Sequence, residues 1–312
     1  MGAIGRFFKD MNKNTAMLLM VLPATAWFIL FSYLPMAGMI IAFKEYRYSR
    51  NGFLSSIIES KWVGFQNFKF LFSTNDAYII TRNTVLYNVV FIVLGLVIAV
   101  AMAIMLAEIT NKRLAKLYQT GMFLPYFLSW VIVGYFVYSF LSLDRGVFNQ
   151  IAEMLGMDPV NWYSSPGYWP VMIVVVFLWK SVGYNSVIYL AAIMGIDKSL
   201  YEAAMIDGAN KWQQIRNVTL PMLMPLMTIL TLLAIGKIFY ADFGLFFQVP
   251  RDSGTLYSVT NVIDTYVYRG LKSTGEIGMT TAAGLYQSII GFILVITSNG
   301  IVRKFNKDNA LF

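Results

Sequence analysis

Long apolar runs alternate with short polar segments along the whole chain. A helix needs about 20 mostly apolar residues to cross the hydrocarbon layer of a membrane. The chain contains six apolar runs of this length. All six should be helices, because a single segment in lipid must satisfy its own backbone hydrogen bonds. The pattern predicts an all-α integral membrane protein in which residues 1–312 form one domain. The six expected spans lie at about 16–43, 84–107, 117–142, 169–195, 222–248 and 280–302.

Prolines interrupt two of these runs. The first run contains Pro23 and Pro35, and the third contains Pro125. Proline has no N–H, and its ring crowds the carbonyl four residues earlier, so kinks are expected at these positions. Neighbouring helices would then complete the hydrogen bonds of the freed backbone groups.

Composition excludes several classes of protein. With 58% hydrophobic and 13% charged residues, the chain is too apolar for a soluble domain of 312 residues. It has no cysteine and no histidine, which removes thiolate sites, the commonest general base and the commonest metal ligand. We therefore expect neither a catalytic nor a metal site. The net charge of +8 does not indicate nucleic-acid binding, because the basic residues flank the spans and form no single patch.

Basic residues also indicate the orientation. The first apolar run is far longer than the roughly 7–15 residues of a signal peptide's apolar region, so it should be a retained span. If both termini are cytoplasmic, basic residues are denser on the inner side, as the positive-inside rule requires. The inner ones are Arg6, Lys9, Lys13, Lys112, Arg113, Lys116, Lys198, Lys211, Arg216, Arg303, Lys304 and Lys307.

Three charged residues fall inside predicted spans: Lys180, Lys237 and Asp242. A lysine facing lipid at mid-span costs roughly 2.5–3.5 kcal/mol on insertion scales, so these groups should face the bundle interior or a watery cavity. They either line a transport path or form an internal lysine–aspartate contact. Asp242 follows Lys237 by five residues, a poor spacing for pairing on one helix, so it should point partly elsewhere.

Aromatic and amide side chains accompany these charges in the third and fourth spans. Tyr126, Trp130, Tyr184 and Asn185 are the candidates for contact with a polar solute. Sugars present apolar CH faces that stack on aromatic rings, and their hydroxyls need amide or hydroxyl partners. Aromatic side chains also fill helix bundles by simple packing, and the sequence leaves both readings open.

The polar gap at 196–221 contains two successive helix starts. Ser199 with Glu202 three residues later predicts a capping box, and Gly208 fits the helix end that follows. Asn210 with Gln213 repeats the start signal. Leu220 and Pro221 should then open the fifth span, since proline is tolerated in a first helical turn.

The order of residues in this gap resembles the cytoplasmic coupling loop of ABC importer permeases. It reads Glu-Ala-Ala, three residues, Gly, nine residues, Val218, one residue and Leu-Pro; the family consensus has isoleucine at Val218. The resemblance implies a coupling helix, between spans four and five, that lies in a groove of an ATPase subunit. Glu202 would pair with a basic residue there, although a purely local capping role stays open. The matching loop residues are Glu202, Ala203, Ala204, Asp207, Gly208, Leu220 and Pro221.

Two further segments, Trp179–Asn185 and Ala241–Phe247, are similar to the carbohydrate-uptake branch of these permeases. This resemblance implies that the chain is a permease subunit of an ATP-driven importer and forms half of its translocation path. The expected substrates are oligosaccharides released from polysaccharides. The resemblance also implies a second homologous permease, an extracytoplasmic solute-binding protein and two ATPase subunits that hold ATP and Mg. The expected location is the bacterial cytoplasmic membrane.

Two other classes of protein compete with this interpretation. A secondary transporter or channel for a polar solute would need no ATPase, but no inverted repeat is evident and the loop pattern would be unexplained. A membrane-embedded enzyme lacks candidate catalytic groups. The chain has no phosphate-binding loop of its own, because Gly236 and Lys237 are followed by isoleucine inside a span.

Overall fold

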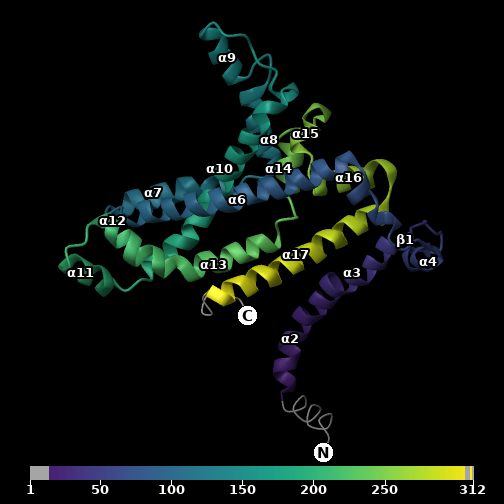
Figure 1. The fold of residues 1–312 in the computed structure, drawn as a ribbon, viewed down its shortest axis with the longest axis horizontal. Helices are drawn as coiled ribbons and strands as arrows, with labels where there is room; N and C mark the ends of the chain where they lie inside the picture. Colours follow the sequence, from purple (N-terminus) through teal and green to yellow (C-terminus); the bar gives the residue numbers. More distant parts are fainter. Residues whose placement is uncertain (1–13, 306–309, 311–312) are drawn as a thin grey trace, which may run out of the picture. The chain divides into compact units, whose positions relative to one another are not determined.

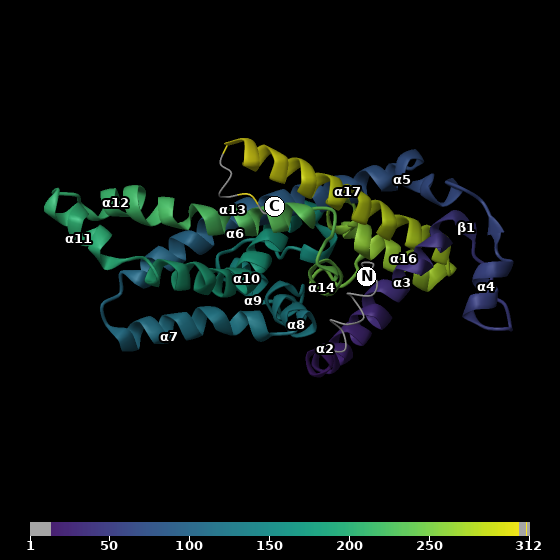
Figure 2. The ribbon, with the colours of Figure 1, turned by 90° about the horizontal axis from the view of Figure 1, so that it is seen from below.

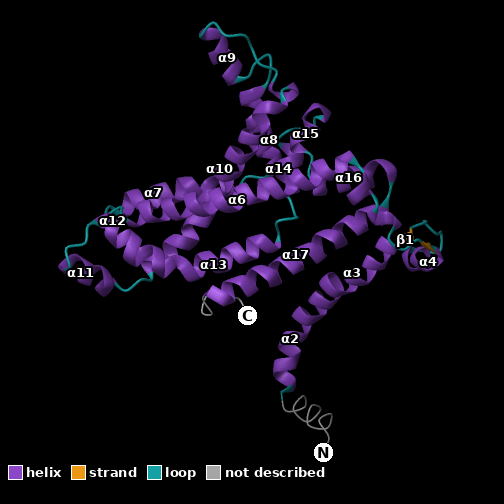
Figure 3. Cartoon of the chain, viewed as in Figure 1, coloured by secondary structure: helices purple, strands orange, loops and turns teal. Residues whose placement is uncertain are grey.

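A computed structural model describes residues 14–305 and residue 310, and it is mostly helical (Figure 3). The predicted inner residues Arg6, Lys9, Lys13 and Lys307 lie outside the described residues. The chain divides into two compact units. One comprises Met1–Lys69 and Gly275–Leu285, and the other comprises Phe70–Thr274 and Tyr286–Phe312.

The first unit begins with one apolar helical stretch, Thr15–Phe43, which is long enough to cross a membrane. Its parts are α2 (Thr15–Phe28), a π-helical turn (Ile29–Tyr33), α3 (Leu34–Ala37) and a 3-10 helix (Gly38–Phe43). The π turn directly precedes Leu34 and Pro35, where a wider turn makes room for the proline ring.

A small hairpin follows in the same unit. Strands β1 (Lys44–Glu45) and β2 (Lys61–Trp62) pair antiparallel, with α4 (Phe53–Glu59) between them. The ring of Phe43 stacks on Trp62 at a centroid distance of 5.7 Å. The unit also contains a 3-10 helix (Gln66–Phe68) and the first residues of α17 (Ile277–Phe305).

The second unit is built on three long helices, α6 (Asn75–Ala107), α10 (Trp169–Met194) and α13 (Leu220–Gly236), which pack side by side (Figures 1 and 2). The short helices α11 (Lys198–Ile206) and α12 (Lys211–Gln214) lie at one end of this bundle. Helices α14 (Phe243–Gln248) and α16 (Ile263–Thr274) lie toward the other end. The unit also contains α5 (Phe70–Ser73), α7 (Lys112–Phe123), α8 (Trp130–Leu141), α9 (Val147–Met154), α15 (Tyr257–Thr260) and the part of α17 from Tyr286 onward.

The third predicted span, 117–142, is not one helix. Helix α7 and a 3-10 helix (Leu124–Phe127) end at Leu128, and α8 leaves at an angle of 100°. The break lies at Leu128 and Ser129, both extended, while Pro125 sits inside the 3-10 helix. The Ser129 hydroxyl accepts a hydrogen bond from Ile132 N–H and so begins the new helix.

The fifth predicted span, 222–248, is also broken, so the expectation of one helix there is wrong. Helix α13 ends at Gly236, residues 237–242 are not helical, and α14 begins at Phe243. The helical stretch that contains α13 starts earlier than the predicted span, at Lys211. It passes through a π turn (Ile215–Thr219) just before Leu220 and Pro221. Leu220 and Pro221 do open α13, as predicted, but α13 continues the helical turns before it without a break.

Five described helices are long and apolar enough to cross a membrane, and the bent α7–α8 pair would make a sixth. Besides Thr15–Phe43 they are Asn75–Ala107, Pro166–Met194, Lys211–Gly236 and Ile277–Lys304.

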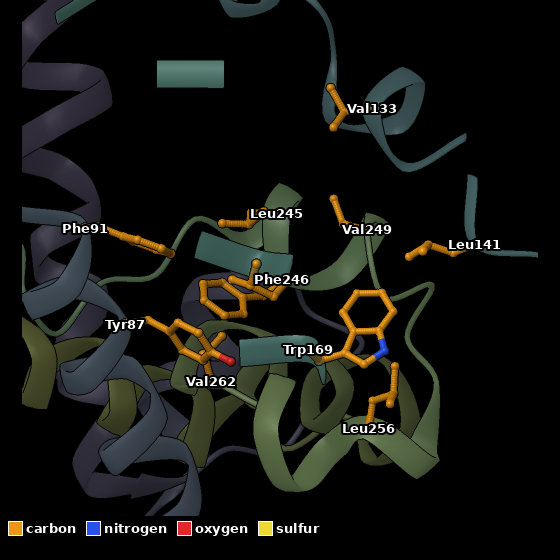
Figure 4. Packing of buried hydrophobic residues seen from close by; sticks show 11 residues of the cluster. Tyr87, Phe91, Val133, Leu141, Trp169, Leu245, Phe246, Val249, Leu256 and Val262 are labelled. Carbon is orange, nitrogen blue, oxygen red and sulfur yellow. The ribbon is translucent and has the colours of Figure 1, made fainter. Parts of the chain in front are cut away.

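The main core lies where α8, α10, α14 and the residues around Leu256 and Val262 meet (Figure 4). Trp169 is completely buried in it and donates its indole N–H to the Trp162 carbonyl at 2.7 Å. A second cluster joins α6, α10 and α13, where Ala99 and Ala103 let the helices approach closely.

Candidate functional site

A cavity of about 670 Å³ opens between α6, α10, α13 and the non-helical segment 237–242. Four predicted residues line it: Tyr184, Asn185, Lys237 and Asp242. The other lining residues are Asn88, Phe91, Ile92, Gly95, Leu96, Phe177, Ile188, Tyr189, Leu230, Thr231, Ala234, Tyr240 and Ala241. The wall thus combines aromatic rings with amides, hydroxyls, one ammonium group and one carboxylate.

Stacked aromatic rings form two parts of this wall. Phe91 and Phe177 lie 3.8 Å apart between ring centroids, with an angle of 14° between their planes. Tyr184 stacks on Tyr126 at 4.3 Å, so Tyr126 supports the lining from behind without being part of it. Such stacking fixes the rings as rigid, partly polar surfaces.

The broken fifth span is held by side chains from three other helices. The Asn88 amide donates to the carbonyls of Ile238 and Tyr240, both at 3.0 Å. The Gln287 amide donates to the Phe239 carbonyl at 2.6 Å. These bonds replace the helical hydrogen bonds that segment 237–242 lacks, so its backbone can remain unwound beside the cavity.

Asp264 completes this support from α16. Its carboxylate accepts the Ala241 N–H at 2.8 Å and a longer bond from the Gln287 amide at 3.3 Å. Burial raises the pKa of Asp264, and the Ala241 N–H opposes that rise by stabilising the carboxylate. The sequence pattern indicated neither Asp264 nor the amides of Asn88 and Gln287, because their role exists only once the span is broken.

Asp242 begins α14 instead of lying on one helix with Lys237. One carboxylate oxygen caps the Leu245 N–H at 3.2 Å, and the other accepts the Trp130 indole N–H at 2.8 Å. Gly244 allows this approach, since a Cβ there would overlap the Trp130 ring. Asp242 therefore joins the starts of α8 and α14.

Lys180 lies behind the cavity wall, at the break of the third span. Its ammonium donates to the carbonyls of Leu128 at 2.6 Å, Tyr126 at 2.7 Å and Pro125 at 3.3 Å. The same ammonium lies 5.1 Å from the centre of a Trp130 ring, within cation–π range. Lys180 thus supplies a donor to the Tyr126 and Leu128 carbonyls at the interruption, while the Pro125 carbonyl also accepts the Leu128 N–H.

Lys237 has a different environment. It follows the last residue of α13, is exposed, and lines the cavity. Within residues 14–305, no hydrogen bond, ion pair or aromatic ring holds its ammonium group. The two lysines therefore have different surroundings: Lys180 holds backbone carbonyls, and Lys237 faces the cavity.

The predicted coupling loop forms two short helices. Asp197, not Ser199, begins α11: its carboxylate accepts the Ser199 N–H at 2.9 Å. This hydrogen bond lowers the pKa of Asp197. The predicted capping box of Ser199 with Glu202 is wrong, because Ser199 already lies inside the helix; Glu202 is free of that local role and is exposed.

Gly208 ends α11 as expected. Its φ of 78° places it in the left-handed region. Its N–H donates to the Met205 carbonyl at 3.0 Å, and the Ala209 N–H donates to the Ala204 carbonyl at 2.9 Å. This pair of bonds is the Schellman arrangement that favours glycine.

The rest of the loop is fixed to the bundle but presents an open face. Asn210 and Gln213 form the predicted capping box of α12. The exposed residues of α11 and its end include Glu202, Ala203 and Asp207, together with Ile206, whose exposed fraction is 87%. Leu200 and Met205 of the same helix are also exposed, and a group of exposed apolar side chains is typical of a contact surface.

Comparison with protein families matches residues 92–307 to a family described as the binding-protein-dependent transport system inner membrane component. The polygalacturonan/rhamnogalacturonan transport system permease protein YteP of Bacillus subtilis (strain 168) is 31% identical over 290 residues, which are 93% of this chain and 88% of that protein. Protein LplB of the same organism is 30% identical over 298 residues, 96% and 92% of the two chains.

Two crystal structures contain a chain of similar fold. One is of a bacterial ABC transporter involved in the import of the acidic polysaccharide alginate. Its chain has a TM-score of 0.86 and 32% identity, covering 96% of this chain and 99% of that one. The other is of a bacterial alginate ABC transporter in complex with an alginate pentasaccharide-bound periplasmic protein, with a TM-score of 0.86, 31% identity and coverages of 97% and 99%.

Proposed function

Because the chain belongs to the inner membrane components of binding-protein-dependent transport systems, we propose that it is one permease subunit of an ATP-driven importer of oligosaccharides. The observation that carries the substrate class is the cavity, whose stacked rings and amides suit the CH faces and hydroxyls of sugars. The relatives support it, since YteP is named for pectic polysaccharides and the crystallised transporters for alginate.

Within this proposal the predicted path residues divide into three groups. Tyr184, Asn185 and Lys237 contact the passing saccharide, because they line the cavity. Asp242 lines the cavity too, but both of its oxygens are occupied by Leu245 and Trp130. Lys180, Trp130 and Tyr126 are positioning residues that hold the broken spans and the Tyr184 ring in place.

The second part of the proposal concerns α11, which we assign as the coupling helix. Ala203 and Ala204 leave its surface without bulk, so an ATPase subunit can approach the backbone closely. Glu202 and Ile206 then supply one charged and one apolar contact. ATP and Mg would bind to the ATPase subunits, since the sequence contains no phosphate-binding loop.

The proposed assembly contains this chain, a second homologous permease, two ATPase subunits and an extracytoplasmic solute-binding protein. It lies in the bacterial cytoplasmic membrane with both termini and the loop 196–221 inside. The segments at 143–168 and 249–279 would then face the binding protein.

Cysteine labelling tests both the orientation and the ATPase contact in this natively cysteine-free chain. Asp158→Cys should react with an impermeant thiol reagent added to intact cells. Lys198→Cys, at the exposed start of α11, should react only in inverted vesicles, and more slowly when the ATPase is bound. Labelling of Lys198→Cys from outside would overturn the orientation, and equal labelling with and without the ATPase would overturn the coupling assignment.

A further inference from the structure

A second, smaller cavity of about 290 Å³ lies beyond the far end of α14. Helix α14 joins the two cavities: Asp242 at its start lines the larger one, and Gln248 at its end lines the smaller one. Six residues at 1.5 Å each separate them by about 9 Å. The residues of the smaller cavity are Val131, Gly134, Tyr135, Phe247, Gln248, Arg251 and Asp252.

The backbone at this cavity is strained. Arg251 and Asp252 have φ angles of 55° and 48°, and they are the described non-glycine residues with positive φ. Holding a non-glycine residue there costs roughly 1–3 kcal/mol, and such strain persists where surrounding contacts enforce it. Here those contacts are the Asp252 N–H to the Phe247 carbonyl at 3.0 Å and the Arg251 N–H to the Gln248 carbonyl at 3.3 Å.

This backbone turn directs the adjacent side chains of Arg251 and Asp252 to different partners. Asp252 pairs with Arg269 at 2.6 Å and also accepts the Tyr257 hydroxyl at 3.1 Å. The Arg251 guanidinium instead lies over the Tyr138 ring, 4.1 Å from its centre. No ion pair among the described residues includes Arg251, so the cavity keeps one uncompensated positive charge.

The remaining lining supplies the other groups that a sugar acid needs. Tyr135 is 65% exposed and offers a ring face for the pyranose, and the Gln248 side-chain amide has no hydrogen bond within the described residues. Gly134 packs directly on the Gln248 backbone, since a Cβ there would lie 2.7 Å from the Gln248 carbonyl oxygen. This contact fixes α14 against α8 beneath the cavity.

We propose that this cavity is an outer subsite for one uronic acid residue of an acidic oligosaccharide, with Arg251 binding its carboxylate. The planar guanidinium, already oriented by Tyr138, matches a carboxylate with two parallel hydrogen bonds. On the way inward the saccharide then reaches Lys237, the second cation without an acid partner among the described residues. The inference rests on the proposed function and narrows its substrate to acidic saccharides.

The test uses the complete transporter in vesicles with its binding protein and a panel of labelled oligosaccharides. The panel contains pectic, alginate and xylan fragments that carry uronic acids, the methyl esters of those acids, and neutral fragments of equal length. We expect uptake of a fragment with free carboxylates. Transport of neutral fragments alone would overturn the acidic subsite but leave the proposed function standing, whereas no uptake of any fragment would contradict the proposed function itself.

The decisive variant is Arg251→Gly, because glycine accepts the positive φ, so the side chain and its guanidinium are removed without adding backbone strain. Its yield should equal or exceed that of the wild type, while uptake of the acidic fragment falls about tenfold, as expected for the loss of a charge-assisted hydrogen bond. Arg145→Gln, at an exposed arginine of another outer segment, should leave uptake unchanged. If Arg251→Gly transports the acidic fragment as well as the control does, Arg251 does not bind it.

Discussion

Replacing Gly208 with valine is expected to leave the permease in the membrane but to disconnect it from the ATPase. The φ of 78° at Gly208 is unfavourable for any β-branched residue, at a cost of roughly 1–3 kcal/mol. A Cβ there would meet no atom within 4 Å, so the variant acts through the backbone turn and not through a clash. If the turn sets the position of α11, uptake and saccharide-stimulated ATP hydrolysis should both fall about tenfold or more.

Gly156 provides a matched control for this variant. It ends α9 with a φ of 74°, and a Cβ at this position would also meet no atom within 4 Å. Its N–H donates to the Glu153 carbonyl, and the Met157 N–H donates to the Ala152 carbonyl, which is the same pair of bonds as at Gly208. Gly156→Val should therefore carry the same local strain and keep ATPase coupling. Normal coupling in Gly208→Val, or equal loss in both variants, would remove α11 from the mechanism.

The two lysines should give opposite phenotypes when each is replaced with methionine. Lys180→Met removes the donor that the Tyr126 and Leu128 carbonyls share at the break of the third span, whereas the Pro125 carbonyl keeps the Leu128 N–H. A carbonyl left without a partner away from water costs roughly 1–3 kcal/mol. The yield of assembled complex should drop several-fold. Lys237→Met removes an ammonium that no described residue holds, so the yield should stay normal while uptake falls about tenfold.

Purification yield and transport per purified complex separate these outcomes. Lys116→Met, at an exposed lysine of α7, is the control for loss of a positive charge alone and should match the wild type in both measurements. Normal yield and normal uptake in both test variants would mean that Lys180 does not hold the broken span and Lys237 does not line the path.

Hydropathy could locate the apolar helices because membrane insertion depends on length and apolarity, which are properties of each segment alone. It could not find the breaks at 128–129 and 237–242. Both lie inside apolar runs, and each exists because side chains from other helices satisfy the unwound backbone. Those partners, among them Asn88 and Lys180, are distant in sequence from the breaks that they stabilise. No local sequence pattern therefore predicts these contacts.

The loop shows the same division between local and distant information. Gly208, Asn210 and Gln213 were predictable because their bonds close within five residues. The first cap was assigned wrongly to Ser199, since Asp197 two residues earlier offers an equally good acceptor and the sequence does not rank them. The sequence pattern did not single out Arg251, because the carboxylate-binding role proposed for it depends on a backbone turn and on Tyr138 from another helix.

Uptake of a labelled oligosaccharide into vesicles that contain the whole complex tests the central claim most directly. With the binding protein on the outer side and ATP on the side of α11, the saccharide should accumulate against its gradient. Omitting either ATP or the binding protein should abolish accumulation. Equally fast uptake without ATP, stopping when the two concentrations are equal, would identify a channel or carrier and contradict the assignment as an importer permease.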